Sequence, residues 1–244
     1  MSLALVLALT RTPNPIPMAT CTVFEQTHVH QVYESIAKAF DTTRFCYWDA
    51  VKQFLDALPP RAVVLDDGCG NGKYLRYPGR AIQWVGNDIC ANLLKCCQDK
   101  MPAADGGCRH DLVQANGLHL PYRKGFFDAA ISIAVLHHLS TPDRRHAFLS
   151  EMARVLRPGG RALITVWAAE QRHKRMKDWC IQPNGDAMIP WKDIHGTVLQ
   201  WRYYHLFNQQ EFTELIQSIH GWHIQTLGYD HDNWYAVVVS VVRV

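Results

Sequence analysis

The chain has 244 residues, of which 48% are hydrophobic and 19% charged, and its formal net charge is +3. This length suits one large α/β domain with a full core, and the small positive excess permits contact with RNA without requiring it. The eight cysteines include no C-x-x-C pair, so no metal site is expected. Reduced thiols are typical of a cytoplasmic protein, or of one that also enters the nucleus.

The first segment, 1–20, is predicted to be a disordered tail. Its apolar run, 3–9, is too short to span a bilayer and lacks the basic leader of a signal peptide. No later stretch is long and apolar enough to be transmembrane. We therefore expect a single domain over 21–244 and no contact with a membrane.

Apolar residues at helical spacing predict two helices before the first strand, and strands and helices then alternate five times. This alternation is typical of a doubly wound, mostly parallel sheet with helices on both faces. A closing hairpin brings the expected number of strands to seven. The helices are predicted at 28–40, 47–58, 91–100 and 143–156, and the strands at 62–65, 82–88, 111–115, 127–135, 162–167, 224–227 and 234–241.

The alternating pattern breaks between 168 and 200. A cluster of basic residues and two proline-containing turns predict an insertion with loop character that faces the substrate. After it, Asn208 with Glu211 three residues later resembles a capping box, which predicts the start of another helix.

The stretch Leu65–Tyr74 carries the strongest chemical signal. Three glycines at alternate positions follow Asp66 at the end of a buried strand. Glycine lets the backbone lie against a ligand, because a Cβ would clash there. A glycine trio alone is also found in ordinary strand–loop–helix turns. The next strand ends in Asp88, about 20 residues on, where a ribose-binding carboxylate sits in a βαβ nucleotide site.

The block Asp66-x-Gly68-Cys69-Gly70-x-Gly72 resembles motif I of class I S-adenosylmethionine-dependent methyltransferases, and Gly86-x-Asp88 resembles their second motif. The resemblance implies S-adenosylmethionine as cofactor, with its ribose hydroxyls on the second acid. Two residues depart from the pattern: Asp67 replaces a small or apolar residue, and Asn116 stands where Asp is frequent. The cofactor-binding residues that the resemblance implies are Asp66, Gly68, Gly70, Gly72, Tyr74, Asp88, Asn116 and Ala134.

Further blocks resemble a narrower group, the eukaryotic tRNA carboxymethyluridine methyltransferases of the yeast type and of the AlkB-like fusion proteins. The resemblance implies methylation of the carboxylate of 5-carboxymethyluridine at the wobble position of tRNA, which gives the methyl ester. It also implies two partners, the anticodon stem-loop and a small zinc-binding activator subunit. The blocks include Val29–Ala37, Thr43–Phe45, Ser132–Ser140, Ile189–Trp191, Arg202–Leu206 and Asp232–Trp234.

The implied acceptor is a carboxylate with a pKa of about 4, so it is ionised at neutral pH and needs orientation rather than a strong base. A guanidinium is a natural clamp for a carboxylate. Arg44 and Arg202 are therefore the predicted catalytic residues, with His138 as a hydrogen-bond partner. Residues predicted to contact the substrate are Tyr33, Trp167, Tyr204, Lys174 and Arg175, although the aromatic ones also suit a core.

Two other functions fit the same sequence. A methyltransferase for a small quinone or phenolic acid would need no basic rim, and Arg44 and Arg202 would then be structural. A catalytically degenerate scaffold that binds RNA or a protein would explain the unusual residues Asp67 and Asn116.

Overall fold

The computed structural model describes residues 21–43, 46–79, 81–101, 110–171 and 174–241. The tail predicted over 1–20 lies outside these ranges, and so does Arg44. No helix within them is long and apolar enough to cross a membrane.

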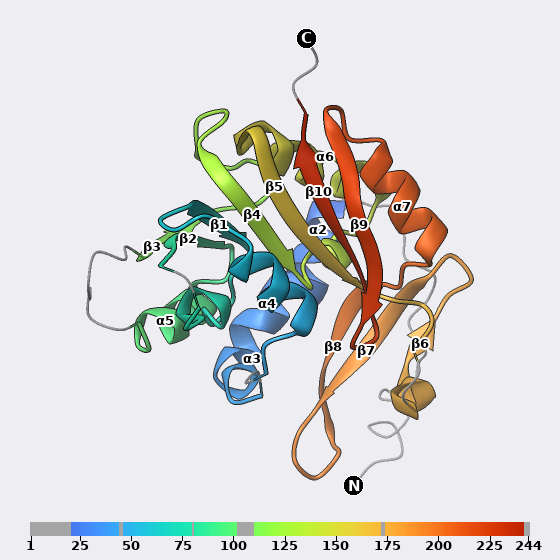
Figure 1. Ribbon diagram of the computed structural model, residues 1–244. Helices are drawn as coiled ribbons and strands as arrows, with labels where there is room; N and C mark the ends of the chain where they lie inside the picture. Colours follow the sequence, from blue (N-terminus) through green and yellow to red (C-terminus); the bar gives the residue numbers. More distant parts are fainter. Residues whose placement is uncertain (1–20, 44–45, 80, 102–109, 172–173, 242–244) are drawn as a thin grey trace, which may run out of the picture.

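A seven-stranded sheet forms the centre of the molecule, in the order β3-β2-β1-β4-β5-β10-β9 (Figure 1). The first five strands are parallel, and β10 runs antiparallel to both of its neighbours. This order confirms the predicted doubly wound sheet with a closing hairpin. The strands are β1 Val63–Asp67, β2 Gln83–Asp88, β3 His110–Gln114, β4 Phe127–Ile133, β5 Leu156–Trp167, β9 Trp222–Asp230 and β10 Asn233–Ser240.

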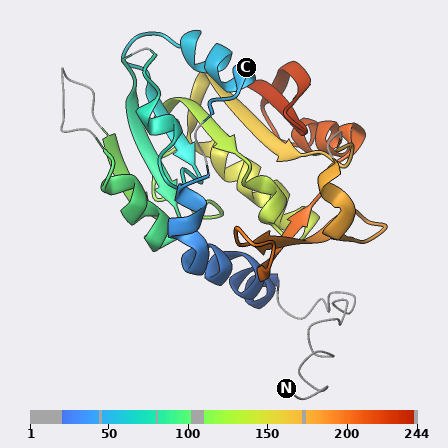
Figure 2. The same ribbon diagram turned by 90° about the horizontal axis from the view of Figure 1, so that it is seen from below.

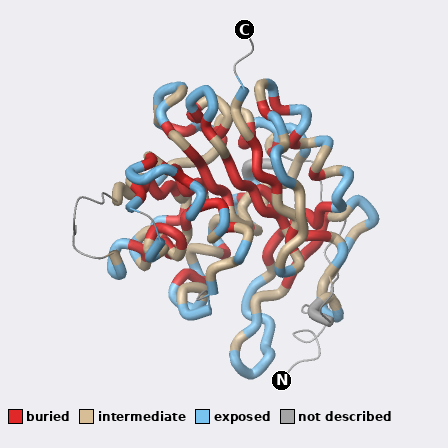
Figure 3. The backbone as a smooth tube through the Cα atoms, in the orientation of Figure 1, coloured by how far each residue is buried: buried red, intermediate tan, exposed pale blue. Residues whose placement is uncertain are grey.

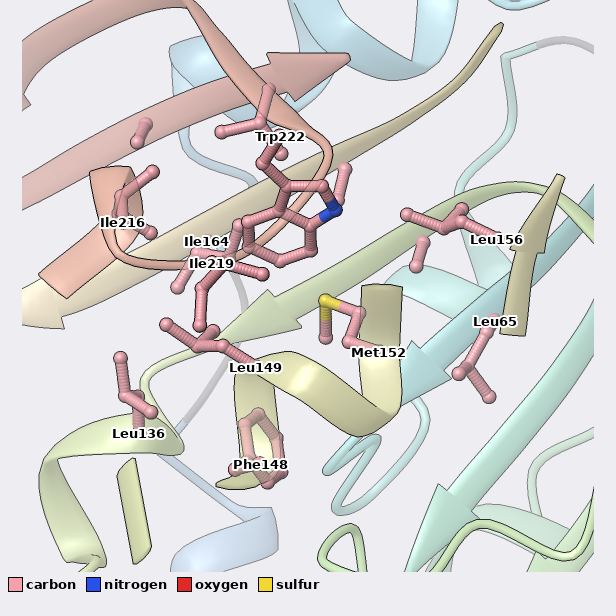
Figure 4. Packing of buried hydrophobic residues seen from close by; sticks show 14 of the residues in the cluster. Leu65, Leu136, Phe148, Leu149, Met152, Leu156, Ile164, Ile216, Ile219 and Trp222 are labelled. Atoms are coloured by element: carbon pink, nitrogen blue, oxygen red, sulfur yellow. The ribbon is translucent and has the colours of Figure 1, made fainter. Parts of the chain in front are cut away.

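Helices cover both faces of the sheet, because successive strand residues point to opposite sides. Val64 packs under α4 (Asp49–Asp56) and α5 (Ala91–Gln98), whereas its neighbour Leu65 packs under α6 (Pro142–Val155) and α7 (Gln209–Gln217). Both sides of the central strands are therefore buried, as the red segments in Figure 3 show. Figure 4 shows the second layer, where the side chains of α6 meet those of β5 and the α7–β9 region.

Side-chain caps fix where α6 and α7 begin. Pro142, expected just outside its helix, is its first residue, because Thr141 caps the helix by accepting from the Arg144 N–H. Asn208 caps α7 by accepting from the Glu211 N–H at 2.9 Å. Glu211 does not complete the predicted capping box, since its carboxylate bonds His205 and Arg145 instead.

The chain before β1 is helical over a longer stretch than predicted. α2 (Cys21–Glu25), a π-helical turn (Gln26–His30) and α3 (Gln31–Asp41) follow one another without a break. Glu25 is 1% exposed and anchors this segment, because its carboxylate accepts hydrogen bonds from Arg144 and Ser140. Seen from below, α3 lies beside α5 (Figure 2).

The loop character predicted for 168–200 is wrong. A second, antiparallel sheet of three strands begins there, preceded by a short 3-10 helix over Lys174–Asp178. The prolines sit at a turn and within β7, where they hid the strand pattern. The strands are β6 Cys180–Ile181, β7 Asp186–Lys192 and β8 Val198–His205, and the β7–β8 hairpin projects away from the central sheet (Figure 1).

Candidate active site

A cavity of about 750 Å³ lies at the carboxyl ends of β1, β2 and β4. In a doubly wound sheet this is the edge where ligands bind. The glycine turn and the strand-end acids line one side of the cavity, and residues of α3 and β8 line the other. Within the described ranges, no three His, Cys, Asp or Glu side chains cluster as metal ligands would.

The three glycines of the turn have different roles. Gly68, Gly70 and Gly72 all have positive φ, at 87°, 54° and 72°, which only glycine adopts readily. Gly70 lines the cavity, and a Cβ added there would meet no atom within 4 Å, so its backbone is open to a ligand. Gly72 does not line the cavity. A Cβ at Gly72 would clash with Cys97 of α5, so this glycine permits helix packing instead of the predicted cofactor contact.

Asp88 presents a fixed carboxylate to the cavity. Its two oxygens accept hydrogen bonds from the N–H groups of Gly70 and Cys90, each at 2.8 Å. Burial raises the pKa of Asp88, and these N–H groups act in the opposite direction by stabilising the charged form. Each oxygen keeps a second lone pair, so the group can accept from two neighbouring hydroxyls, as a ribose diol requires.

The adjacent acids of β1 both line the cavity, but their surroundings differ. Asp66 lines the cavity, and burial raises its pKa. Asp67 is 1% exposed and accepts a hydrogen bond from the Asn87 side chain at 2.8 Å. Burial raises the pKa of Asp67 to about 7. The hydrogen bond to Asn87 and the raised pKa both lessen the repulsion between these two neighbouring acids.

The other predicted cofactor residues lie around the same side of the cavity. Asn116 lines it, and its side-chain oxygen accepts from the Leu118 N–H at 3.0 Å while retaining a second lone pair. Tyr74 lines the cavity, and burial raises the pKa of its hydroxyl. Ala134 adopts φ 61°, and its N–H donates to Thr165 Oγ1 at 3.0 Å. Ala134 lines the cavity directly after β4 ends, and its left-handed conformation turns the chain there.

Five predicted residues meet elsewhere on the cavity wall, although they come from four separate parts of the chain. The Tyr33 hydroxyl lies 3.0 Å from His138 Nε2 and 3.1 Å from the Tyr204 hydroxyl. Arg202 Nη1 donates to the same hydroxyl at 3.4 Å. Trp167, at the end of β5, packs against Tyr204 with ring centroids 4.5 Å apart. All of these residues line the cavity.

The hydrogen bonds fix which atoms donate in this cluster. His138 Nδ1 lies 2.9 Å from the carbonyl oxygen of Tyr203, which can only accept, so Nδ1 carries the proton. His138 Nε2 must then accept from the Tyr33 hydroxyl, whose oxygen accepts in turn from Tyr204 and Arg202. Burial lowers the pKa of His138 to about 3, which keeps the ring neutral.

This arrangement corrects the role predicted for His138. Both of its ring nitrogens bond protein groups, so neither is left to bind a substrate carboxylate. His138 instead holds the Tyr33 hydroxyl in place and is a positioning residue.

Arg202 is the most unusual charge of the site. It is 5% exposed, and its guanidinium lies 5.0 Å from the Trp191 ring centroid and 5.2 Å from that of Tyr204. Among the residues that the structure describes, no Asp or Glu forms an ion pair with it, and its Nε has no hydrogen-bond partner. A buried charge without a counter-ion is costly. The cavity therefore offers a site for an anion.

The structure leaves some predictions open and adds residues that sequence reasoning missed. The side chains of Lys174 and Arg175, like Arg44, lie outside the described part of the chain. The missed residues that line the cavity include Trp179 and Asn233. Asn233 lies in one of the blocks noted in the sequence, whereas Trp179 had no signal because no element was expected around it.

Comparison with known proteins agrees with this geometry. Residues 65–164 match the model of a methyltransferase domain. The tRNA (carboxymethyluridine(34)-5-O)-methyltransferase of Schizosaccharomyces pombe is 36% identical over 232 residues, which are 88% of this chain and 96% of that protein. The Arabidopsis thaliana enzyme of the same name is 50% identical over 147 residues, or 60% of this chain, and this chain covers 34% of its length.

Solved structures with this fold are more distant in sequence. A SAM-dependent methyltransferase from Methanosarcina mazei superimposes with a TM-score of 0.65 at 19% identity, covering 82% of this chain and 100% of that one. A complex between the Haloferax volcanii Trm112 methyltransferase activator and a methyltransferase gives a TM-score of 0.63 at 15% identity, covering 88% of this chain and 99% of that one. These likenesses show the fold.

Proposed function

This chain belongs to the family of tRNA (carboxymethyluridine(34)-5-O)-methyltransferases, and we propose that it methylates the carboxylate of 5-carboxymethyluridine at the wobble position of tRNA, with S-adenosylmethionine as methyl donor. The product is the methyl ester, 5-methoxycarbonylmethyluridine. The fission yeast relative supports this most directly, because the match covers nearly the whole of both chains.

One observation carries the proposal: the buried guanidinium of Arg202, which pairs with no Asp or Glu of the described residues, lines the same cavity as the fixed carboxylate of Asp88. Arg202 Nη1 donates to Tyr33, and Nη2 forms no hydrogen bond with a described residue, so Nη2 is free for an anionic acceptor. An arginine with a purely structural role would be expected to pair with an acid. Its lack of one among the described residues favours a carboxylate acceptor over a neutral phenol.

The residues present fit the cofactor. Asp88 can accept from both ribose hydroxyls, and Gly70 leaves its backbone open to the methionine part. Asn116 retains a lone pair for the adenine amino group. Asp67 and Asn116 therefore leave the cofactor side intact, which argues against a degenerate scaffold. When bound, S-adenosylmethionine supplies an electrophilic methyl group on a positively charged sulfur.

The chain's own residues then have to bind and orient the acceptor carboxylate and to exclude water from it. The acceptor carboxylate has a pKa of about 4, so no group has to remove a proton from it. Arg202 and the Tyr33 hydroxyl network orient the carboxylate, and His138 keeps that network in one arrangement. Orientation of this kind can lower a barrier by roughly 7–11 kcal/mol.

The aromatic walls suit a base that has left its stack. Trp167 contacts Tyr204 and stacks on Trp179, with ring centroids 4.5 Å and 5.3 Å apart. Such surfaces offset the cost of unstacking an anticodon base. Trp191 packs half-buried against Arg202 but does not itself line the cavity.

We also propose a small zinc-binding activator subunit as partner, and a cytoplasmic and nuclear location. The Haloferax complex supports the first, since its methyltransferase shares this fold. β3 is the edge strand of the central sheet, and four of its five residues are only partly buried. A strand edge of this kind can accept a covering partner.

The decisive experiment measures methyl transfer from labelled cofactor to tRNA, with the activator present. Transfer RNA from cells that lack this enzyme should be labelled, because it carries the free carboxylate, whereas tRNA from wild-type cells should accept little. Alkaline hydrolysis should release the label, as expected for an ester. Equal labelling of both tRNA pools, or label that resists alkali, would contradict the proposed acceptor.

A further inference from the structure

We infer that Asp67 and Asn87 are positioning residues of the cofactor site: the Asp67 carboxyl and the Asn87 amide hold one proton between them in a cyclic acid–amide pair, and the glycine turn keeps its binding geometry only while this proton is present. The inference rests on the proposed function, because it concerns the proposed cofactor. It extends that function by making the affinity for S-adenosylmethionine depend on pH through one buried group.

Asp67 and Asn87 lie side by side at the carboxyl ends of β1 and β2. They are register partners of two parallel strands, and each is only 1% exposed. Asn87 Nδ2 donates to Asp67 Oδ1 at 2.8 Å and to the Ala115 carbonyl at 3.4 Å. Both of these groups are acceptors, so the amide atom that faces them must be the nitrogen. The orientation of the Asn87 amide is therefore fixed.

The second oxygen of each group lacks a donor. Asp67 Oδ2 and Asn87 Oδ1 are buried, and neither has a hydrogen-bond partner among the described residues. Both atoms are acceptors when the acid is ionised, and a buried acceptor without a donor is costly. A proton on Asp67 Oδ2 would satisfy both atoms at once, because Oδ2 would become the donor and Asn87 Oδ1 its acceptor. The acid and the amide would then share two antiparallel hydrogen bonds.

The surroundings of Asp67 favour the protonated form. The titratable groups that interact with its carboxyl are all acidic or neutral, and they are Asp66 from β1, Asp88 from β2, Tyr122 from the loop before β4 and Glu151 from α6. Burial raises the pKa of Asp67 to about 7, and Asp88 and Glu151 act in the same direction. An exposed carboxyl would lose its proton at about pH 4. The pair therefore gains or loses its proton near neutral pH.

The proton is linked to the cofactor site through the backbone of Asn87. The Asn87 carbonyl accepts from the N–H groups of Gly68 and Cys69, at 2.7 Å and 2.9 Å, where the glycine turn begins. The next residue is Asp88, the proposed ribose ligand. If Asp67 ionises, its Oδ2 and Asn87 Oδ1 become two buried acceptors that repel each other. We expect the ends of β1 and β2 to move apart, and the turn and Asp88 to move with them.

The test measures the Kd for S-adenosylmethionine by calorimetry between pH 6 and pH 8.5, using the full chain with its activator. The wild-type Kd should rise about 5-fold to 10-fold over this range, because only the protonated pair holds the turn. Asp67→Asn should change by less than about 2-fold, because the new amide forms the same two hydrogen bonds with Asn87 at every pH. Asp143→Asn, at an exposed acid of α6, is the matched control and should follow the wild type.

Further measurements identify the proton itself. Near pH 7.5, calorimetry in buffers of different ionisation enthalpy should show that the wild type takes up about half a proton more than Asp67→Asn when the cofactor binds. S-adenosylhomocysteine, which lacks the positive charge on sulfur, should give the same pH slope, because the effect acts through the turn. Infrared spectra at pH 6 should contain the carbonyl band of a protonated carboxyl that Asp67→Asn lacks.

The outcomes separate the two proposals. If the wild type binds no S-adenosylmethionine at any pH, the proposed function is wrong. If it binds and Asp67→Asn keeps the wild-type pH slope, the inference is wrong. A wild-type affinity that rises with pH would also overturn the inference, since the ionised acid would then assist binding. Asp67→Leu removes the acid too, so its slope should be flat, and it keeps the test decisive if Asp67→Asn does not fold.

Discussion

The two sides of the cavity are built in different ways. On the cofactor side, Asp66, Gly70 and Asp88 lie close together in the sequence, and the main hydrogen bonds join a carboxylate to backbone N–H groups. On the acceptor side, the Tyr33–Tyr204 hydrogen bond joins residues 171 positions apart, and side chains bond one another. The first side is acidic and is set by local backbone geometry. The second side is cationic and aromatic, and its residues come together only when the chain folds.

This contrast has a chemical meaning. On the proposed assignment, a positively charged donor would meet carboxylates on one side, and a negatively charged acceptor would meet a guanidinium on the other. The two sides should therefore respond independently to substitution, one through cofactor affinity and the other through turnover on tRNA.

The largest effect is expected for Arg202→Met, which keeps much of the side-chain volume and removes the charge. Loss of the clamp should lower kcat/KM for tRNA about 1000-fold, or about 4 kcal/mol of transition-state stabilisation. Calorimetry should find the Kd for S-adenosylmethionine within about 2-fold of the wild type. Arg157→Met, at an exposed arginine paired with Asp128, serves as control. A parallel loss of cofactor binding would show that the two sides are not independent.

The next effect belongs to the cofactor side. Asp88→Ala removes a charge and the acceptor for two N–H groups, so the Kd for S-adenosylmethionine should rise about 100-fold. Affinity for tRNA should change little. Asp143→Ala, at an exposed acid of α6, is the matched control. Unchanged calorimetric affinity in Asp88→Ala would contradict the assignment of the ribose site.

Tyr33→Phe tests the network with a smaller change. It removes the hydroxyl shared by His138, Tyr204 and Arg202 but keeps the ring. Since one neutral hydrogen bond contributes about 1 kcal/mol, kcat should fall roughly 10-fold or less, with no effect on cofactor affinity. Tyr47→Phe removes a comparable hydroxyl, bonded to the Arg76 carbonyl, and should leave kcat unchanged. Equal rates in both variants would remove Tyr33 from the mechanism.

The smallest effect concerns stability against pH. The pKa of His138 is about 3 in the folded protein and about 6.5 in the unfolded chain, so only the unfolded chain takes up this proton as the pH falls from 7 to 5. The wild type should lose about 1–2 kcal/mol of unfolding free energy from this source. His138→Gln should show a shallower loss over the same range in urea titrations. The same slope in both proteins would mean that His138 is not held neutral.

The sequence predicted the cofactor side of the cavity better than the acceptor side. The glycine turn and Asp88 were found because a short motif encodes both the backbone and the ligand. The meeting of Tyr33 with Tyr204 could not be read from spacing, since it depends on how α3 and the second sheet pack. The role of His138 changed because sequence does not show which ring nitrogen faces the Tyr203 carbonyl. The strands after 180 were missed because β8 is exposed at one end and fully buried at the other, which gives no alternation.

The place of β10 has a consequence for synthesis. It is the last strand to leave the ribosome among those of the central sheet, yet it lies between β5 and β9 and contributes Asn233 to the cavity wall. A nascent chain halted before Asn233 would leave an open edge on β5 and no neighbour for β9. The catalytic pocket is therefore completed late in translation, and truncated products should be substrates for chaperones and proteases rather than partly active enzymes.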